Sequence, residues 1–167
     1  GSGIGSRGDN LTYKRSLLSG EGIESARSVL DVGCGDLEVL RAFKFANYVG
    51  LDLSPLVLER GRQIFPTARF ELGLPVDVDE SEWVLCLEVL IHQRTRSDYD
   101  QLIDYIVAKT RGVLIVSGYE RDSDAIRNNA MVFFHEPLAE SLSRKNKFRR
   151  IEKIGDHTDV AVYRCQV

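Results

Sequence analysis

A glycine-rich turn and an acid that follows it are the residues of this chain best suited to bind a small molecule. The turn reads Asp31-Val32-Gly33-Cys34-Gly35-Asp36, and its two glycines let a ligand approach where a Cβ would collide. Asp52 follows about twenty residues later, at the end of the next apolar run, where a carboxylate can accept hydrogen bonds from ribose hydroxyls. The spacing therefore predicts a site for a ligand that contains ribose.

The charge of this turn distinguishes between ligand classes. The dinucleotide fingerprint requires a third glycine, but Glu38 occupies that position. Asp36 and Glu38 also place negative charge where a pyrophosphate would bind. The Gly-Lys-Ser/Thr sequence of a P-loop is absent. A phosphate-free ligand with a sulfonium and an ammonium group fits better, and a nicotinamide-dependent oxidoreductase is kept as an alternative.

A second group of chemically useful side chains follows the apolar run 83–89. Glu88 lies near the end of that run and is expected either to line the ligand or to bond neighbouring backbone. His92 is expected either to take a proton from a hydroxyl acceptor, as histidine side chains commonly do, or to pack as a loop histidine that contacts the ligand or caps the next helix. Arg94 and Arg96 can clamp a phosphate or carboxylate on an acceptor, or can remain solvated surface arginines.

Three more side chains are expected near the same site. Tyr119 leaves the apolar run 113–117 and should face the mouth of the site. His135 begins a late helix, where it either caps the helix or contacts the acceptor. Cys34 has no adjacent histidine in the turn, so a small residue that fills a tight space is expected rather than a nucleophile.

Alternating strands and helices must position these residues. The apolar runs predict strands at 28–32, 48–53, 68–72, 83–89, 113–117, 149–154 and 160–165. Helical spacing is found at 11–18, 37–43, 99–106 and 137–145, and Ser54-Pro55 opens another helix. Such alternation implies an open, doubly wound α/β sheet with mostly parallel strands. The last two strands are too close for a crossover helix, so they should form an antiparallel hairpin.

The composition is that of one globular domain. The 167 residues are 43% hydrophobic and 28% charged, with a net charge of −3 that gives no general attraction to nucleic acid. No stretch approaches the roughly 18 apolar residues of a membrane span. Three widely spaced cysteines suit neither a disulfide framework nor a metal site, which favours a cytoplasmic setting. Residues 1–10 read as a flexible leader or expression scar, and 11–167 as a single domain.

The ordered motifs resemble those of class I S-adenosylmethionine-dependent methyltransferases. Residues 29–36 resemble the first motif, 48–54 the second, 84–92 the fourth-strand motif of the small-molecule subgroup, and 112–117 and 158–163 the fifth and last strands. This resemblance covers nearly everything after residue 28. It implies a Rossmann-like sheet of seven strands in the order 3-2-1-4-5-7-6, with an antiparallel seventh strand.

The resemblance also implies which residues bind S-adenosylmethionine. The expected cofactor residues are Asp31, Gly33, Cys34, Gly35, Asp52, Leu53, Glu71, Leu87 and Glu88. Asp31 and the glycines would line the methionine end, Asp52 would hold the ribose, and Leu53 would pack near the adenine. The adenine amine usually meets an acid just past the third strand, where Glu71 is the nearest candidate.

The expected activity is methyl transfer to a small acceptor, and the specific expectation is a hydroxyl of an anionic sugar or polysaccharide precursor. His92 would be the base, and Arg94, Arg96, Tyr119 and His135 would lie on the acceptor side. Residues 90–93 and 117–120 look like segments of bacterial methyltransferases of surface-polysaccharide pathways, so a fusion or complex with polysaccharide-assembly proteins is a further expectation. The alternative is a silent S-adenosylmethionine-binding module that acts as a partner or sensor. The sequence lacks the signature of DNA amino-methyltransferases.

Overall fold

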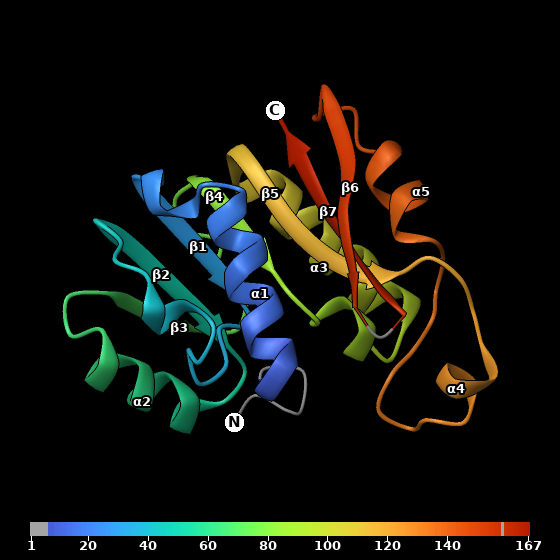
Figure 1. The fold of residues 1–167 in the computed structure, drawn as a ribbon, viewed down its shortest axis with the longest axis horizontal. Coiled ribbons are helices and arrows are strands. Elements are labelled where there is room, and N and C mark those ends of the chain that lie inside the picture. The colour runs from blue at the N-terminus through green and yellow to red at the C-terminus, as the bar shows by residue number, and fades with distance from the viewer. Residues whose placement is uncertain (1–6, 158) are drawn as a thin grey trace.

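One seven-stranded sheet with helices on both faces forms the molecule (Figure 1), and the computed structural model describes residues 7–157 and 159–167. The strands are β1 (Ser28–Val32), β2 (Asn47–Asp52), β3 (Arg69–Leu72), β4 (Ser81–Cys86), β5 (Thr110–Tyr119), β6 (Arg150–His157) and β7 (Val160–Gln166). The α-helices are α1 (Gly8–Gly20), α2 (Pro55–Ile64), α3 (Arg96–Lys109), α4 (Asp124–Arg127) and α5 (Leu138–Ser143). Short 3₁₀ turns are η2 (Ile23–Ser25), η3 (Leu40–Ala42) and η4 (Leu90–His92).

The strand order is β3-β2-β1-β4-β5-β7-β6, which confirms the predicted topology. Strands β1 to β5 pair in parallel with their neighbours, and β7 is antiparallel to both β5 and β6. Because parallel strands end at the same edge of a sheet, the segments that follow β1, β2, β4 and β5 meet there. This edge carries the glycine turn, Asp52, Glu88 and Tyr119.

Two apolar clusters cover the two faces of the sheet. Leu18 of α1 and Leu58 of α2 pack against one face, and Ile103 of α3 and Leu142 of α5 pack against the other. Figure 1 shows α1 in front of the sheet and α3 behind it. All four side chains are at most 2% exposed, so each helix is fixed by its buried face.

The connection after β1 differs from the prediction. The apolar spacing of residues 37–43 indicated an α-helix, but only the 3₁₀ turn η3 forms there. Leu37 has a φ of +62°, which no α-helix accommodates. The Arg15 guanidinium of α1 donates hydrogen bonds to the carbonyls of Glu38 and Val39, which would be acceptors within a helix. The Arg15 side chain therefore donates the hydrogen bonds that backbone amides would donate to these carbonyls in an α-helix.

The amino-terminal helix is longer than expected. It begins at Gly8, so residues 8–10 of the expected leader are helical, whereas residues 1–6 of that leader lie outside the described residues. Within the described ranges, no helix is both long and apolar enough to cross a membrane. All three cysteines are buried as free thiols.

Candidate functional site

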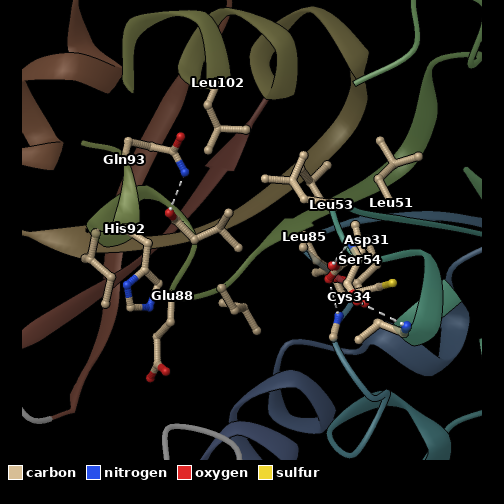
Figure 2. A pocket seen from close by; sticks show the side chains of 18 of the residues that line it. Asp31, Cys34, Leu51, Leu53, Ser54, Leu85, Glu88, His92, Gln93 and Leu102 are labelled. Atoms are coloured by element: carbon tan, nitrogen blue, oxygen red, sulfur yellow. Dashed lines mark hydrogen bonds between the residues drawn. The ribbon is translucent and has the colours of Figure 1, made fainter. Parts of the chain in front are cut away.

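A cavity of about 1330 Å³ lies at the edge where the parallel strands end (Figure 2). The predicted site residues that line it are Asp31, Gly33, Cys34, Gly35, Asp52, Leu53, Leu87, Glu88, His92, Arg94 and Tyr119. Three other predicted site residues are not among its lining residues: Glu71, Arg96 and His135. Figure 2 shows Glu88 and His92 on one side of the cavity and Asp31, Cys34 and Leu53 on the other.

The glycine turn is held against β2 by backbone hydrogen bonds. The amides of Gly33 and Cys34 donate to the carbonyl of Leu51 over 2.8 and 2.9 Å. Gly33 has a φ of +78°, and a Cβ there would overlap the side chain of Val89, so only glycine fits. Burial and the nearby charge of Asp31 raise the pKa of the Cys34 thiol, which keeps it protonated and favours the space-filling interpretation.

The end of β2 presents a carboxylate next to an apolar side chain. The two carboxylate oxygens of Asp52 accept hydrogen bonds from the amides of Gly35 (3.0 Å) and Ser54 (2.9 Å). Each oxygen keeps a lone pair for a further donor such as a ribose hydroxyl. Leu53 follows with 82% of its surface exposed, although it lines the cavity. Such an exposed leucine beside a fixed carboxylate offers an apolar surface to a flat ring.

Asp31 is the most deeply buried acid of the cavity, with 7% of its surface exposed. Burial raises its pKa to about 7, a hydrogen bond from the Tyr48 hydroxyl (2.7 Å) opposes that rise, and the charge of Asp52 adds to it. The ammonium of Lys14 also lowers the pKa. Near neutral pH the carboxyl therefore exists in both forms, and a cation bound in the cavity would favour the carboxylate.

Glu88 and Lys14 join the end of β4 to α1. Glu88 has a φ of +58°, a conformation that costs a non-glycine residue about 1–2 kcal/mol. Its amide donates to the Ser117 hydroxyl (2.7 Å), and its carboxylate lies 3.0 Å from the Lys14 ammonium. Lys14 is only 6% exposed and was missed by the sequence analysis. Its position four residues before Leu18, on the buried face of α1, was the available signal.

His92 ends the short turn η4, and a distant segment sets the tautomer of its neutral ring. Its Nδ1 lies 2.7 Å from the carbonyl oxygen of Met131. Because a carbonyl can only accept, Nδ1 carries the proton of the neutral ring and Nε2 keeps a free lone pair. This arrangement suits a general base.

The same distant segment, residues 131–135, holds the turn at two other points. The amide of Phe133 donates to the carbonyl of Ile91, and Nε2 of His135 donates to the carbonyl of Gln93, each over 2.7 Å. His135 thus supports the turn that carries His92 and does not reach the cavity itself. We call residues 129–135 the strap, since Asn129, Met131 and Val132 also line the cavity.

The two arginines after η4 have different surroundings. Arg94 lines the cavity, is exposed, and makes no hydrogen bond or ion pair with any described residue. Arg96 is instead held by the carboxylates of Asp100 and Glu136, each at 2.9 Å. Tyr119 is half-buried at the cavity, and burial, reinforced by the charge of Glu88, raises its pKa.

Glu71 is directed to a neighbour on the same strand. Its carboxylate accepts a hydrogen bond from Nε of Arg69 over 2.9 Å, and only Gly73 and Leu74 of the segment that follows β3 line the cavity. Among the described residues, the cavity therefore receives no acid from the position predicted to meet the adenine amine.

Comparison with known proteins identifies the fold. No family model and no curated protein sequence matches the chain. The N-methyltransferase NodS of Bradyrhizobium japonicum, in complex with S-adenosylhomocysteine, is 16% identical with a TM-score of 0.71, over 95% of this chain and 85% of that one. Magnesium protoporphyrin IX methyltransferase of Synechocystis, with bound S-adenosylhomocysteine, is 16% identical with a TM-score of 0.69, over 93% and 81%. An O-methyltransferase family protein of Burkholderia thailandensis is 14% identical with a TM-score of 0.69, over 93% and 55%. The chain has the fold of these proteins.

Proposed function

We propose that this protein transfers a methyl group from S-adenosylmethionine to a small acceptor. The observation that carries the proposal is the acidic cavity at the carboxyl ends of β1, β2 and β4, in a fold shared with solved methyltransferases that hold S-adenosylhomocysteine. The cavity combines a glycine turn, the ribose-suited carboxylate of Asp52 and four further acids: Asp31, Glu38, Glu88 and Asp98. These features match a ligand with one ribose and two positive charges.

The residues present fit such a cofactor. The amides of Gly35 and Ser54 fix the carboxylate of Asp52 at the cavity, where it can accept ribose hydroxyls. The exposed side chain of Leu53 can cover the adenine face. Asp31 and Glu88 can balance the positive charge of the methionine end, since acids stabilise nearby cations most strongly where water is excluded.

The chain's own residues would act mainly by positioning. When bound, S-adenosylmethionine supplies an activated methyl group on a cationic sulfur. The glycine turn and Asp52 would fix the cofactor, and the wall formed by Glu88, His92 and Tyr119 would orient the acceptor towards it. Such alignment of two reactants can lower a barrier by roughly 7–11 kcal/mol. With a hydroxyl acceptor, Nε2 of His92 would receive the proton that the hydroxyl loses.

We further propose that the acceptor is a hydroxyl of an anionic sugar, such as a polysaccharide precursor. Arg94 supports this proposal because its guanidinium is free of other described residues and can form forked hydrogen bonds with a phosphate or carboxylate. The fixed tautomer of His92 supports a hydroxyl in particular, because a neutral amine needs no base. The three free thiols support a cytoplasmic location, where such precursors and polysaccharide-assembly partners would meet the protein.

Titration calorimetry with S-adenosylhomocysteine and with NAD tests the cofactor. We expect micromolar binding of S-adenosylhomocysteine and a higher melting temperature in its presence, because a ligand selective for the folded state stabilises it. Tight binding of NAD without a response to S-adenosylhomocysteine would contradict the proposed function. Transfer of a radiolabelled methyl group to phosphorylated sugars, compared with their neutral counterparts, tests the acceptor class.

A further inference from the structure

The β2–β3 end of the cavity needs a partner for the adenine amine, and the segment after β3 provides no acid among the lining residues. Gly73 and Leu74 are its lining residues, and the carboxylate of Glu71 is bonded to Arg69. Leu53 and Leu74 are 82% and 40% exposed at this end, so they offer an apolar slot for a flat ring. A polar group for the ring edge must come from another element.

That element is α3, which runs along the same segment. The Tyr105 hydroxyl donates to the carbonyl of Pro75 over 2.9 Å, and the Lys109 ammonium donates to the carbonyl of Val76 over 2.8 Å. Tyr105 and Lys109 lie four residues apart, so both are on one face of the helix. Gln101 lies one turn before Tyr105 on that face and lines the cavity together with Leu74. The helix therefore presents an amide to the cavity one turn away from its contacts with residues 75 and 76.

The side chain of Gln101 is oriented by its own helix. Its Nε2 donates to the Ser97 hydroxyl over 3.1 Å, which leaves Oε1 as an acceptor and a second N–H as a donor. Adenine presents an amine donor beside a ring-nitrogen acceptor, and a glutamine amide complements this pair. Asp98, one turn earlier, also lines the cavity, and one of its oxygens accepts the Thr95 hydroxyl over 2.7 Å. A carboxylate has only acceptors, so it can accept from the amine but cannot donate to the ring nitrogen.

We infer that Gln101 recognises the 6-amino edge of the cofactor's adenine, an amide from α3 in place of an acid after β3. This inference rests on the proposed function, because it assigns one end of the same cofactor site. Gln101 is a specificity-determining residue in this scheme: it discriminates adenine from rings that carry an oxygen at position 6. It contributes nothing to methyl transfer itself.

The test compares S-adenosylhomocysteine with S-inosylhomocysteine, in which the 6-amino group is replaced by an oxygen. We expect the unmodified protein to prefer S-adenosylhomocysteine by about tenfold to a hundredfold. Gln101→Leu should reduce that preference to nearly one, and Gln101→Ala provides a second variant with the same expectation. Asp98→Asn, which keeps an acceptor for Thr95, is the matched control and should retain the full preference.

The outcomes separate this inference from the proposed function. If the unmodified protein binds neither compound, the proposed function fails and the inference fails with it. If it prefers S-adenosylhomocysteine and folded Gln101→Leu and Gln101→Ala keep that preference, only the assignment of Gln101 is overturned. Loss of the preference in Asp98→Asn but not in the Gln101 variants would overturn it as well, by moving recognition to the carboxylate.

Discussion

The two halves of the cavity are built in different ways. The half at β1 and β2 is fixed by backbone: the amides of Gly33 and Cys34 bond to Leu51, and two other amides hold Asp52. The half at β4 and β5 is fixed by side chains and a distant segment, because His92 depends on the carbonyl of Met131 in the strap. The first half is fixed by contacts between neighbouring strands of the sheet, whereas the second also depends on a segment that lies outside the sheet.

This difference predicts which property of the protein a substitution in each half should change. Backbone hydrogen bonds in the β1–β2 half do not depend on side-chain identity, so the turn keeps its shape as long as its glycines are kept. The proposed contacts to the cofactor in this half depend on the carboxylates of Asp31 and Asp52. In the β4–β5 half, replacing a single strap residue can move the histidine. We therefore expect substitutions at the glycine turn and at Asp52 to affect binding of the cofactor, and those at His92 and Arg94 to affect turnover or the acceptor.

His92→Ala should give the largest effect. With a hydroxyl acceptor, loss of the base should reduce kcat by roughly 10²–10⁴-fold and leave the Kd of S-adenosylhomocysteine unchanged. Steady-state kinetics and calorimetry on the same preparation measure both quantities. Near-full activity would show that positioning alone carries the reaction, and weaker cofactor binding would show that the two halves are not separate.

Gly33→Ala should destabilise the β1–β2 half. The Cβ overlaps Val89 and the residue must keep a φ of +78°, so the free energy of unfolding should fall by about 2–4 kcal/mol. Gly73→Ala is the control, because its φ is +73° but a Cβ there meets nothing within 4 Å. It should cost about 1 kcal/mol from strain alone. Equal losses in denaturant unfolding would show that crowding at Gly33 is unimportant.

Asp52→Ala should weaken cofactor binding by about thirtyfold or more. The carboxylate would lose charge-assisted hydrogen bonds to the ribose that are worth roughly 2–4 kcal/mol in total. Asp79→Ala removes the same charge from an exposed position that does not line the cavity, and it should leave the Kd unchanged. If the two variants bind S-adenosylhomocysteine equally well, the carboxylate does not contact the ribose.

Arg94→Ala should raise the KM of an anionic acceptor by about tenfold, with little change in kcat. Arg96→Ala is the comparison, since its guanidinium is occupied by Asp100 and Glu136 away from the cavity. It should leave the KM near its original value. An equal rise of KM in both variants would point to general charge rather than to a direct contact by Arg94.

The smallest expected effect is a pH dependence of cofactor affinity that arises from Asp31. Its pKa of about 7 means that a proton must leave when a cation binds below that pH, so affinity should fall by up to about tenfold between pH 8 and pH 6. Asp31→Asn cannot ionise and should give a flatter, weaker profile. Calorimetry in buffers of different ionisation enthalpy would detect the released proton, and an identical pH profile in the variant would exclude Asp31 as its source.

Much of the sheet could be predicted from the sequence because its pattern is local. Most of the buried strands are short apolar runs that end at a glycine, acid or serine, and the spacing between runs predicts parallel pairing. The order of the strands came from the resemblance to class I methyltransferases. The helix expected at 37–43 did not form, because Leu37 adopts a positive φ and Arg15 satisfies the carbonyls of Glu38 and Val39. That contact joins residues more than 20 positions apart, and no local pattern encodes it.

The β1–β2 half of the cavity was also predictable, since its residues lie in one turn and at one strand end. The β4–β5 half was predictable only in part: Glu88, His92, Arg94 and Tyr119 line the cavity as expected, but the groups that hold them were not predicted. Arg94 and Arg96 are two residues apart, yet one faces the cavity and the other is bound by Glu136. Lys14 reaches Glu88 from the first helix, and Met131 reaches His92 from a segment with no regular structure. Such placements depend on tertiary packing rather than on periodicity.

The hydrogen bond between His92 and the carbonyl of Met131 links the choice of acceptor to the ability of His92 to accept a proton. If His92 is the base, as proposed, an acceptor that leaves the strap in place keeps Nε2 free, whereas one that displaces Met131 would release the ring to its other tautomer. A wrong acceptor would then bind without being methylated. Selectivity among acceptors should accordingly be expressed in kcat rather than in KM, and non-cognate sugars should act as competitive inhibitors rather than as slow substrates.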